Sequence, residues 1–470
     1  MGRSRKTKRI ATDVTITGLA DKGKAVGRDD EGMVYFVEGA VPGDVVDVWV
    51  KKKKNSYRQG VVSEYKSLSE LRVEPFCEHF GNCGGCKWQY LDYPSQLKYK
   101  NEAVLDAFKR IGQLEIKESR PILGSEHTQT YRNKMEYSFS SRRWVPQEEL
   151  DSQDEVNFGP ATGFHKAGAF NMVVQIEKCF LQDDLSNKIR NFVHELAMEQ
   201  KWTYYNSREH HGFLRNMIVR NTTLGDWMVV PIFGEDHPEQ RELLMKSLVE
   251  KFPELTAVFY VVNTKMNDST FDQTFHHYHG QEYITEKLGH INYKIGPKSF
   301  FQTNTFQARV LYDQIVELAQ LKGDEVVYDL YTGLGSIALY LADKCQKVIG
   351  IEEVPAAIED ADVNKELNKV SNAFFEVGDC KQVFNGDFVE RHGQADLIVV
   401  DPPRMGLHAD VVTMLGNTGV KKIIYVSCNP ATQARDLGLL HDRYSVELIQ
   451  PVDMFPHTHH IENIALLKRR

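Results

Sequence analysis

Several features that would place the chain in a common class are missing from the sequence. No apolar run approaches the roughly 20 residues needed to cross a bilayer, and the basic N-terminus has no signal-peptide core. Cysteine is scarce: the 470 residues include seven, an odd number that does not suit a fully paired disulfide framework. A membrane or secreted protein is therefore not expected, and the cysteine usage favours a reducing, cytoplasmic location.

An overall excess of positive charge is also missing. The chain has 57 Lys and Arg against 65 Asp and Glu, a formal net charge of -8, which argues against a protein that coats nucleic acid over its whole surface. A local basic face is still compatible with this balance, since binding follows where the charge lies. Residues 1–10 are basic and poor in apolar side chains, so we expect them to be disordered, as a solubilising tail or an arm that reaches phosphates.

Residues 1–70 are predicted to form a small closed barrel. About five short β-compatible runs alternate with Gly, Asp and Lys turns, which is typical of OB-like folds. Tyr57 and Arg58 follow the basic run Lys51–Lys54. Basic residues beside an aromatic on such a barrel suit RNA binding by charge and base stacking. A solvated hairpin tip is the alternative, and the RNA interpretation is favoured.

The rest of the chain divides into two further regions. Residues 71–295 contain strand-like and helical stretches of a mixed α/β domain, whereas residues 296–470 alternate between helices and buried strands. These strands are predicted at Val326–Leu330, Lys347–Ile351, Ala373–Glu376, Leu397–Val400 and Ile423–Val426. The alternation predicts an α/β, doubly wound parallel sheet of the Rossmann-like type.

The first strand of this sheet is followed by a glycine turn. Gly333 and Gly335 let the backbone approach a ligand closely, but a full G-x-G-x-x-G fingerprint is missing, so no pyrophosphate loop is demanded. Glu352 ends the next strand, where an acid can bind both ribose hydroxyls of an adenosine. Asp379 ends the third strand, where it could contact the adenine edge. The set favours S-adenosylmethionine over a nicotinamide cofactor.

Three further residues suggest chemistry at the same sheet edge. Asp401 opens a DPPR turn after the fourth strand, as in methyltransferases that present polar groups to a planar base, although two prolines could simply end a strand. Cys428 leaves the fifth strand in an SCNP turn and is poised as a nucleophile if its pKa falls below the free value of about 8.5. Glu462 lies between Ile461 and Ile464, and apolar surroundings would raise its pKa and suit proton abstraction.

A separate group of cysteines indicates a metal site. Cys77, Cys83 and Cys86 follow a C-x5-C-x2-C spacing, and Cys179 is the plausible fourth ligand. Four thiolates suit either zinc or a 4Fe–4S cluster, and the spacing does not decide between them. The Cys-x3-Cys-x2-Cys triplet of a radical S-adenosylmethionine site is missing. We therefore expect a structural or RNA-facing site and not a redox-catalytic one.

In order and spacing these motifs resemble the RNA 5-methyluridine methyltransferases with an iron–sulfur cluster, which methylate uridines in 23S ribosomal RNA. The resemblance extends over nearly the whole chain and includes FFQTN at 300–304, the glycine turn, DPPR, SCNP and the HIE at 460–462. The N-terminal region resembles the TRAM domain, an OB-like RNA-binding barrel. The resemblance implies a class I methyltransferase domain at 296–470 and a central domain at 71–295 that carries a 4Fe–4S cluster, with zinc as the second choice.

The resemblance also implies a role for each site residue. Cys428 would be the nucleophile and Glu462 the base. The cofactor site would be lined by Gln302, Tyr331, Ser336, Glu352, Asp379 and Asp401, with Asp401 also near the uracil. The cluster ligands would be Cys77, Cys83, Cys86 and Cys179. Uracil C5 is too weak a nucleophile by itself, so addition of the cysteine to C6 is expected to activate it.

The expected activity is methylation of C5 of a uridine in RNA, with 23S ribosomal RNA as the first choice of substrate. The same chemistry on transfer RNA is the alternative, as is a non-catalytic RNA-binding protein on a methyltransferase scaffold. Methylation of cytosine, of DNA or of a nitrogen is disfavoured, because nitrogen methylation needs no cysteine and the Pro-Cys motif of DNA cytosine enzymes is missing. A monomer is expected, since one chain holds one complete site.

Overall fold

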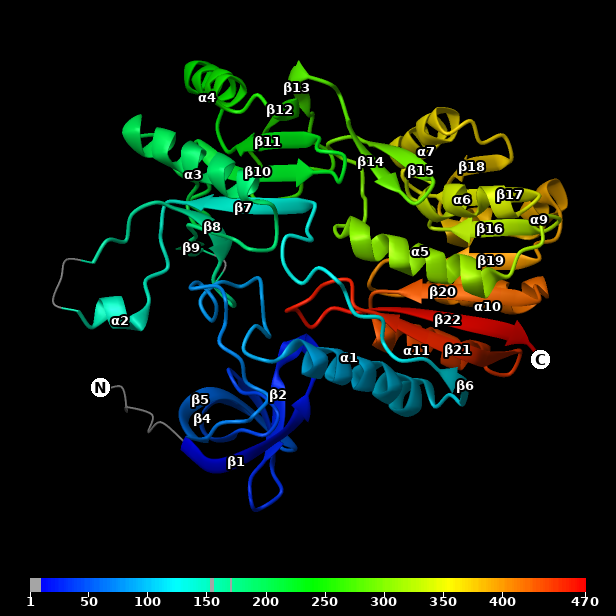
Figure 1. Ribbon diagram of the computed structural model, residues 1–470, viewed down its shortest axis with the longest axis horizontal. Coiled ribbons are helices and arrows are strands. Elements are labelled where there is room, and N and C mark those ends of the chain that lie inside the picture. The colour runs from blue at the N-terminus through cyan, green and yellow to red at the C-terminus, as the bar shows by residue number, and fades with distance from the viewer. Residues whose placement is uncertain (1–9, 153–155, 170) are drawn as a thin grey trace.

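The computed structural model describes residues 10–152, 156–169 and 171–470 (Figure 1). The expected N-terminal arm lies outside these residues except for Ile10, which begins the first strand and so does not belong to a disordered segment. Five strands close a barrel in the order β1-β2-β3-β5-β4. They are β1 (Ile10–Leu19), β2 (Ala25–Arg28), β3 (Val34–Glu38), β4 (Val45–Lys53) and β5 (Tyr57–Ser67). The basic run Lys51–Lys54 is exposed at the β4–β5 turn, as expected.

The middle region of the chain forms a seven-stranded sheet, in the order β13-β12-β11-β10-β7-β8-β9. Its strands are β7 (Lys134–Ser140), β8 (Ala161–His165), β9 (Val173–Gln175), β10 (Leu214–Asn221), β11 (Trp227–Phe233), β12 (Leu255–Val262) and β13 (His276–Gly280). Helices α3 (Asp184–Glu199) and α4 (Pro238–Lys251) pack on it and share a core with β7, β10 and β11 (Figure 1). A short helix, α2 (Gln147–Leu150), lies in the β7–β8 connection.

The C-terminal sheet has eight strands in the order β18-β17-β16-β19-β20-β22-β21-β6. Its parallel strands are β16 (Val326–Leu330), β17 (Lys347–Glu352), β18 (Ala373–Val377), β19 (Leu397–Val400) and β20 (Lys422–Ser427). They confirm the predicted doubly wound sheet. An antiparallel hairpin of β21 (Tyr444–Val452) and β22 (Glu462–Arg469) extends it beyond β20.

Helices cover both faces of this sheet, whose buried side chains form two apolar cores. Helices α5 (Thr305–Ala319) and α6 (Ser336–Leu341) contribute to one core. Helices α9 (Gly386–His392), α10 (Ala409–Thr418) and α11 (Pro430–Leu440) contribute to the other, and α7 (Pro355–Leu367) packs against β18. None of the helices in the described ranges is both long and apolar enough to span a membrane.

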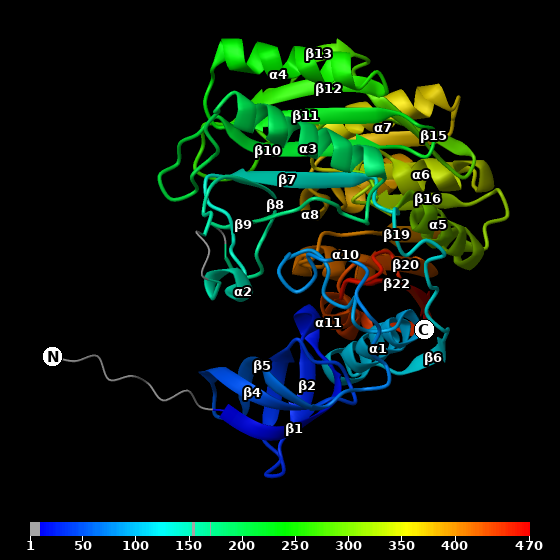
Figure 2. The same cartoon turned by 60° about the vertical axis from the view of Figure 1, so that its left-hand side comes forward.

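A segment from the N-terminal half of the chain completes this layer. Helix α1 (Tyr93–Ala107) lies beside α11 (Figure 2), and β6 (Ile116–Ser119) pairs in parallel with β21 at the sheet edge. The expected domain ranges 71–295 and 296–470 therefore do not separate the two sheets in this region. The reason is physical: the apolar face of α1, including Val104, is buried in the same core as α10 and α11.

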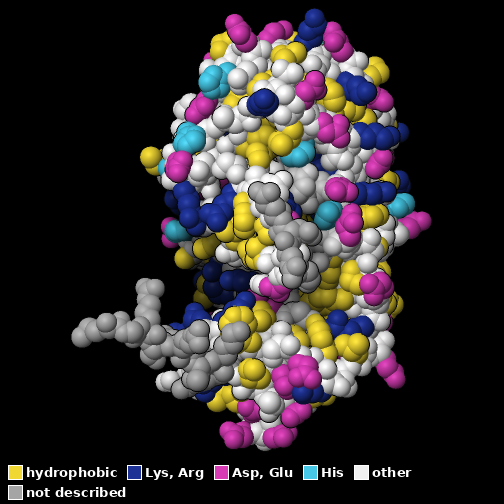
Figure 3. Space-filling model, turned by 90° about the vertical axis from the view of Figure 1, so that its left-hand side faces the viewer, with side chains coloured by type: hydrophobic (Ala, Val, Ile, Leu, Met, Phe, Trp, Pro, Cys, Tyr) yellow, Lys and Arg dark blue, Asp and Glu magenta, His cyan; other side chains and the backbone are white. Residues whose placement is uncertain are grey.

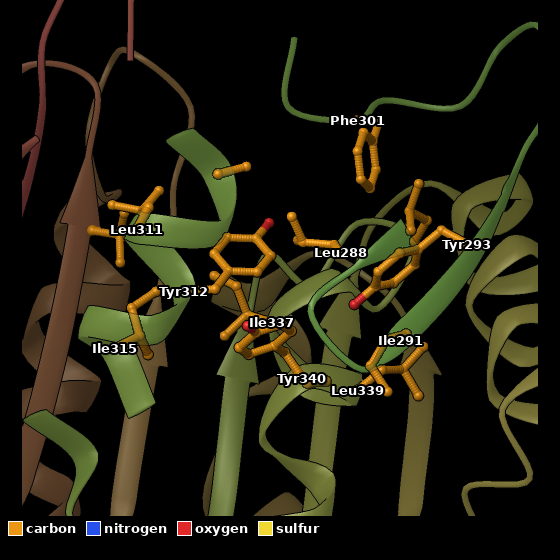
Figure 4. Packing of buried hydrophobic residues seen from close by; sticks show 14 of the residues in the cluster. Leu288, Ile291, Tyr293, Phe301, Leu311, Tyr312, Ile315, Ile337, Leu339 and Tyr340 are labelled. Carbon is orange, nitrogen blue, oxygen red and sulfur yellow. The ribbon is translucent and has the colours of Figure 1, made fainter. Parts of the chain in front are cut away.

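The hairpin of β14 (Ile284–Leu288) and β15 (Ile291–Ile295) joins the central and C-terminal layers. Its side chains pack with those of α5 and α6 (Figure 4). Within this core the Tyr293 hydroxyl donates to the Ser336 carbonyl at 2.8 Å and the Tyr312 hydroxyl to Ser336 Oγ at 2.9 Å. The start of α6, which closes the glycine turn, is thus fixed by two buried tyrosines.

Candidate active site and cysteine cavity

Strand register brings Cys428 and Glu462 together. Ser427 ends β20 and pairs with Asn463 of β22, so Cys428 directly follows one partner and Glu462 directly precedes the other. Both side chains therefore begin at the same end of the antiparallel pair. Glu462 is 5% exposed, and its charge acts on the Cys428 thiol. The structure places the two predicted catalytic residues beside each other.

Burial dominates the acid–base properties of this group. It raises the pKa of Cys428 to about 11, with the nearby carboxyls of Glu462 and Asp401 adding to the rise, so the lowered thiol pKa expected of a nucleophile is not found in this structure. Burial and the charge of Asp401 also raise the pKa of Glu462 well above its usual value. The pKa of Asp401 is raised to about 7, first by burial and then by Asp329. A low local dielectric thus favours the neutral form of each group.

Arg404 is the one residue that opposes these shifts at both positions. Its guanidinium lies against the Cys428 thiol and lowers its pKa, and its charge lowers that of Glu462 as well. The Arg404 carbonyl accepts from Asn429 Nδ2 at 3.1 Å and from Thr432 Oγ1 at 3.3 Å. No role for Arg404 is predicted from the sequence, although the DPPR motif that contains it could have pointed to one.

The glycine turn and the end of β17 form the candidate cofactor site. Glu352 accepts from the Gly333 amide at 3.1 Å and from the Val354 amide at 3.1 Å, which holds its carboxylate next to the turn. Gly333 has φ +56°, and a β-carbon there would meet nothing within 4 Å, so the turn faces open space. A backbone free of side chains beside a fixed carboxylate fits the ribose of an adenosine cofactor.

Asp329 braces this turn from below. It is completely buried, and its Oδ2 accepts from Thr332 Oγ1 at 2.6 Å and from the Ala338 amide at 3.0 Å. Burial raises its pKa to about 7. Tyr331, between strand and turn, has φ +68°, and its amide donates to the Ile351 carbonyl at 3.0 Å. The predicted residues Tyr331, Ser336 and Glu352 therefore all belong to one braced turn.

Of the three other predicted cofactor residues, Asp401 lies beside Glu462, whereas Gln302 and Asp379 lie on neighbouring segments. The Gln302 carbonyl accepts from Asn133 Nδ2 of the central layer at 2.9 Å. Two residues on, Asn304 caps α5 and donates to the Met454 carbonyl at 2.9 Å. Asp379 caps α8 (Cys380–Val383), and its carboxylate pairs with Lys381 at 3.0 Å. Asp379 thus follows the third parallel strand as predicted, but its side chain is engaged with Lys381.

The four cysteines expected to bind a metal line one cavity of about 290 Å³. These are Cys77, Cys83, Cys86 and Cys179. Burial raises the pKa of each thiol, to about 11 for Cys83 and about 12 for Cys86. Three cations, Arg132, Lys134 and Lys178, share the lining. Among the described residues, no three or more His, Cys, Asp and Glu side chains converge closely enough to hold a single metal ion.

Behind this cavity a buried arginine holds the Cys179 segment. The Cys179 amide donates to Asn187 Oδ1 at 2.8 Å, and Arg190 donates to the same oxygen at 2.9 Å. Arg190 is completely buried and also donates to the Glu177 carbonyl at 2.5 Å. The backbone position of Cys179 is therefore fixed by α3, in a way that the sequence spacing did not indicate.

Basic side chains connect the barrel to this region. Lys166, which follows β8, is half-buried, and burial together with the charges of Lys87 and of Lys51 on the barrel lowers its pKa. Figure 3 shows Lys and Arg side chains gathered around a hollow at mid-height on this face. The local basic face that the net charge of -8 left open is thus present.

The fold and site define a class. A doubly wound sheet with a glycine turn, an acid ending the second strand and ligand groups at the carboxyl edge is a class I S-adenosylmethionine-dependent methyltransferase domain, here joined to a small closed barrel. Comparison with known proteins supports this. Residues 273–470 match the tRNA (Uracil-5-)-methyltransferase family model, and residues 5–62 match the TRAM domain.

Relatives cover almost the full chain. An uncharacterized RNA methyltransferase of Bacteroides thetaiotaomicron is 47% identical over 455 residues, which is 96% of this chain and 100% of that protein. One from Chlorobaculum tepidum is 38% identical, over 97% and 96% of the two chains. The solved structure of Pyrococcus abyssi tRNA (uracil-54, C5)-methyltransferase with S-adenosyl-L-homocysteine aligns at a TM-score of 0.75 and 30% identity, over 97% and 99%. The chain belongs to the RNA uracil-5 methyltransferase family.

Proposed function

We propose that the protein forms 5-methyluridine in RNA through a covalent adduct between Cys428 and C6 of the uracil. The observation that carries this proposal is the grouping of one thiol, two carboxyls and one guanidinium at the end of β20 and β22: Cys428, Glu462, Asp401 and Arg404. A non-catalytic RNA-binding protein would have no use for a half-buried thiol beside a buried carboxyl.

The reaction begins when the half-buried Cys428 thiol loses its proton to solvent and the thiolate attacks C6. The new S–C6 bond moves an electron pair onto the ring, and the enolate carbon C5 then attacks the methyl group. S-adenosylmethionine supplies that methyl group when it is bound. Glu462 takes the C5 proton, the S–C6 bond breaks, and the thiolate returns. Glu462 must be ionised to take this proton, and its raised pKa makes the carboxylate, once formed, a stronger base than a free one. Arg404 stabilises the thiolate.

The cofactor residues are proposed on the geometry of the braced turn. Glu352 would bind the ribose hydroxyls and Asp379 the adenine edge, if it exchanges its contact with Lys381 for the base. Gln302, Tyr331, Ser336 and Asp401 would complete the lining. We expect the ligand to approach the protein backbone in the open space in front of Gly333.

The cysteine cavity is proposed to hold a 4Fe–4S cluster. A zinc site requires all four sulfurs within about 2.3 Å of one point, and the described thiols do not converge so closely. They do surround a cavity of about 290 Å³, which suits a larger core. The cationic lining by Arg132, Lys134 and Lys178 suits the negative charge of a cluster held by four thiolates. Its proposed role is to hold residues 77–86 on the central layer.

The RNA substrate is proposed to be 23S ribosomal RNA, with transfer RNA as the second candidate. The barrel and the cysteine cavity are the two features that favour ribosomal RNA. However, the Pyrococcus abyssi tRNA (uracil-54, C5)-methyltransferase aligns with 97% of this chain, a share that includes the barrel. The barrel therefore does not discriminate between the two substrates, and that similarity favours the second candidate. The free cysteines suit a cytoplasmic location, and a monomer is proposed because one chain holds one site.

The test is a map of 5-methyluridine, by mass spectrometry of nucleosides and oligonucleotides, in fractionated RNA from cells that have the protein, lack it, or carry Cys428→Ala. Loss from ribosomal RNA that Cys428→Ala fails to restore would support the first candidate. Loss from transfer RNA would contradict ribosomal RNA as the substrate and would still support the proposed chemistry. Purified wild-type protein that transfers no labelled methyl group to either RNA would contradict the proposed function.

A further inference from the structure

One face of α1 is directed at the connection between β21 and β22. Tyr93, Gln96 and Lys100 lie three and four residues apart, so their side chains project from the same side of the helix. All three reach the segment 453–457. These contacts join positions more than 350 residues apart in sequence. They are separate from the contacts that bury α1 against α11.

The centre of this contact is a buried ion pair. Lys100 Nζ and Asp453 Oδ1 are 2.6 Å apart, and both side chains are 0% exposed. The Tyr93 hydroxyl donates to Asp453 Oδ2 at 2.9 Å, and Lys100 also donates to the Phe455 carbonyl at 3.0 Å. A buried ion pair contributes little net stability compared with apolar side chains, because both charges must be desolvated. A role in fixing one geometry explains its presence better than stability does.

Gln96 holds the next part of the segment. Its Oε1 accepts from the His457 amide at 2.9 Å, and its Nε2 lies 3.2 Å from His457 Nδ1. His457 has φ +64°, a left-handed conformation that is strained for a non-glycine residue. The Lys87 and Trp88 amides both donate to the His457 carbonyl. Hydrogen bonds from α1 and from residues 87–88 thus hold the backbone of His457 in an unfavourable conformation.

Register connects these anchors to the proposed base. Asp453 directly follows Val452, the last residue of β21, and Val452 is paired with Glu462. Residues 453–461 therefore connect two residues that are paired with each other, Val452 at one end and Glu462 at the other. A shift of Asp453 would therefore act first on Val452, the residue paired with Glu462.

We propose that Tyr93, Gln96 and Lys100 of α1 are positioning residues for Glu462. They act through Asp453 and His457 and touch neither substrate nor cofactor. The inference rests on the proposed function, in which Glu462 removes the C5 proton after methyl transfer. Its consequence is specific to one step: loosening the segment slows proton removal and leaves thiolate addition and methyl transfer in place. The methylated RNA then stays attached to Cys428.

The experiment uses purified full-length protein, a uridine-containing RNA substrate and labelled S-adenosylmethionine. Covalent protein–RNA adduct is measured on denaturing gels, and S-adenosylhomocysteine is measured in a single turnover. Lys100→Met is the main variant, and Tyr93→Phe, which removes one hydroxyl, is the milder one. Glu462→Gln is the positive control. Arg215→Met removes another buried cation, which binds the 263–268 loop of the central domain, and controls for a general loss of packing.

We expect Lys100→Met to form about one S-adenosylhomocysteine per chain at a near wild-type rate, to turn over at least 10-fold more slowly, and to accumulate adduct. Tyr93→Phe should show a smaller accumulation and Arg215→Met none. If Lys100→Met does not fold, Tyr93→Phe decides. Equal slowing of both steps without adduct, or unchanged turnover in a folded variant, would overturn the inference. Absence of adduct in Glu462→Gln, or of methyl transfer in wild type, would instead contradict the proposed function.

Discussion

The protein holds thiols in two settings that differ in the charges around them. The cavity of Cys77, Cys83, Cys86 and Cys179 is lined by three cations and one carboxyl, Glu136. The single thiol of Cys428 faces two carboxyls, Glu462 and Asp401, and one guanidinium, Arg404. Burial raises the thiol pKa in both places.

The difference indicates what each setting is able to stabilise. Several thiolates at once need positive charge nearby, which the cavity supplies and which a bound metal centre would add to. Cys428 instead belongs to a group of one thiol, two carboxyls and one guanidinium, in which the ionisation of one member changes the pKa of the others and so sets a balance of protons within the group. Such a balance suits a reaction in which a proton leaves one group and later reaches another. The predictions below test this contrast between a ligand site and a reaction site.

The largest effect is expected at the reaction site. Cys428→Ala removes the atom that must bond to C6, so methyl transfer should fall by roughly 10⁴-fold or more. Cys83→Ala is the matched variant, because it removes a buried thiol from the other setting. It should lower the iron content and leave methyl transfer within about tenfold of wild type. Single-turnover assays with labelled cofactor give both rates. Comparable losses in the two variants would remove the distinction between the sites.

A second, smaller effect is expected from Arg404. Its guanidinium lowers the pKa of Cys428, so Arg404→Met should raise that pKa and reduce the thiolate fraction at neutral pH. The ascending limb of the pH–rate profile, along which the rate rises as the thiol loses its proton, should move to higher pH. The rate near pH 7 should then fall about tenfold for each pH unit by which the limb moves. Arg404→Lys keeps the charge and should move the limb less. An unchanged profile with a raised KM for RNA would assign Arg404 to binding.

The sequence predicts individual strands and the residues that follow them better than it predicts pairing between distant segments. The buried strands of the C-terminal sheet were recognisable because both faces are covered and the apolar runs are continuous. Cys428 could be placed at the sheet edge because it follows one of those runs. The pairing of β6 with β21 could not be predicted, since it joins positions about 330 residues apart and depends on packing that a four-residue strand does not encode.

The same limit applies inside the sites. Glu462 was a candidate from its apolar neighbours and from family resemblance, but its position opposite Cys428 depends on the antiparallel register of β20 and β22. Periodicity does not reveal register. The Lys100–Asp453 pair was missed for the same reason, because its partners lie on separate elements. The spacing of Cys77, Cys83 and Cys86 predicted a metal site with Cys179 as the plausible fourth ligand, but it could not choose between zinc and a cluster.

A third effect concerns the cysteine cavity alone. If the cavity holds a cluster, Cys179→Ser should reduce the iron bound per chain and the absorbance near 400 nm, and should lower the melting temperature by several degrees, since bound metal stabilises the folded form. Chelation of wild-type protein should have the same effect. Cys345→Ser, a buried cysteine outside the cavity, is the control and should keep its iron. Zinc instead of iron in the wild-type protein would contradict the proposed cluster.

The smallest effect is a change in stability at Asp401. Its pKa is raised to about 7, so between about pH 4 and pH 7 the folded form binds more protons than the unfolded form, and the free energy of unfolding falls as the pH rises. Asp401→Asn removes this cost. The variant should melt like wild type below pH 4 and should be more stable above pH 7 by about 1 to 3 kcal/mol, measured without cofactor.

Asp442→Asn removes an exposed carboxyl, 87% accessible in its side chain, and should show no pH-dependent difference from wild type. A constant gain at every pH for Asp401→Asn would mean that packing is responsible and not ionisation. A gain that appears only above pH 4 and reaches its full value near pH 7 would mean that the reaction site carries a cost in stability. Asp401 would then lower the free energy of unfolding at neutral pH, and its presence would be explained by a function for a carboxyl with a raised pKa beside Cys428 and Glu462.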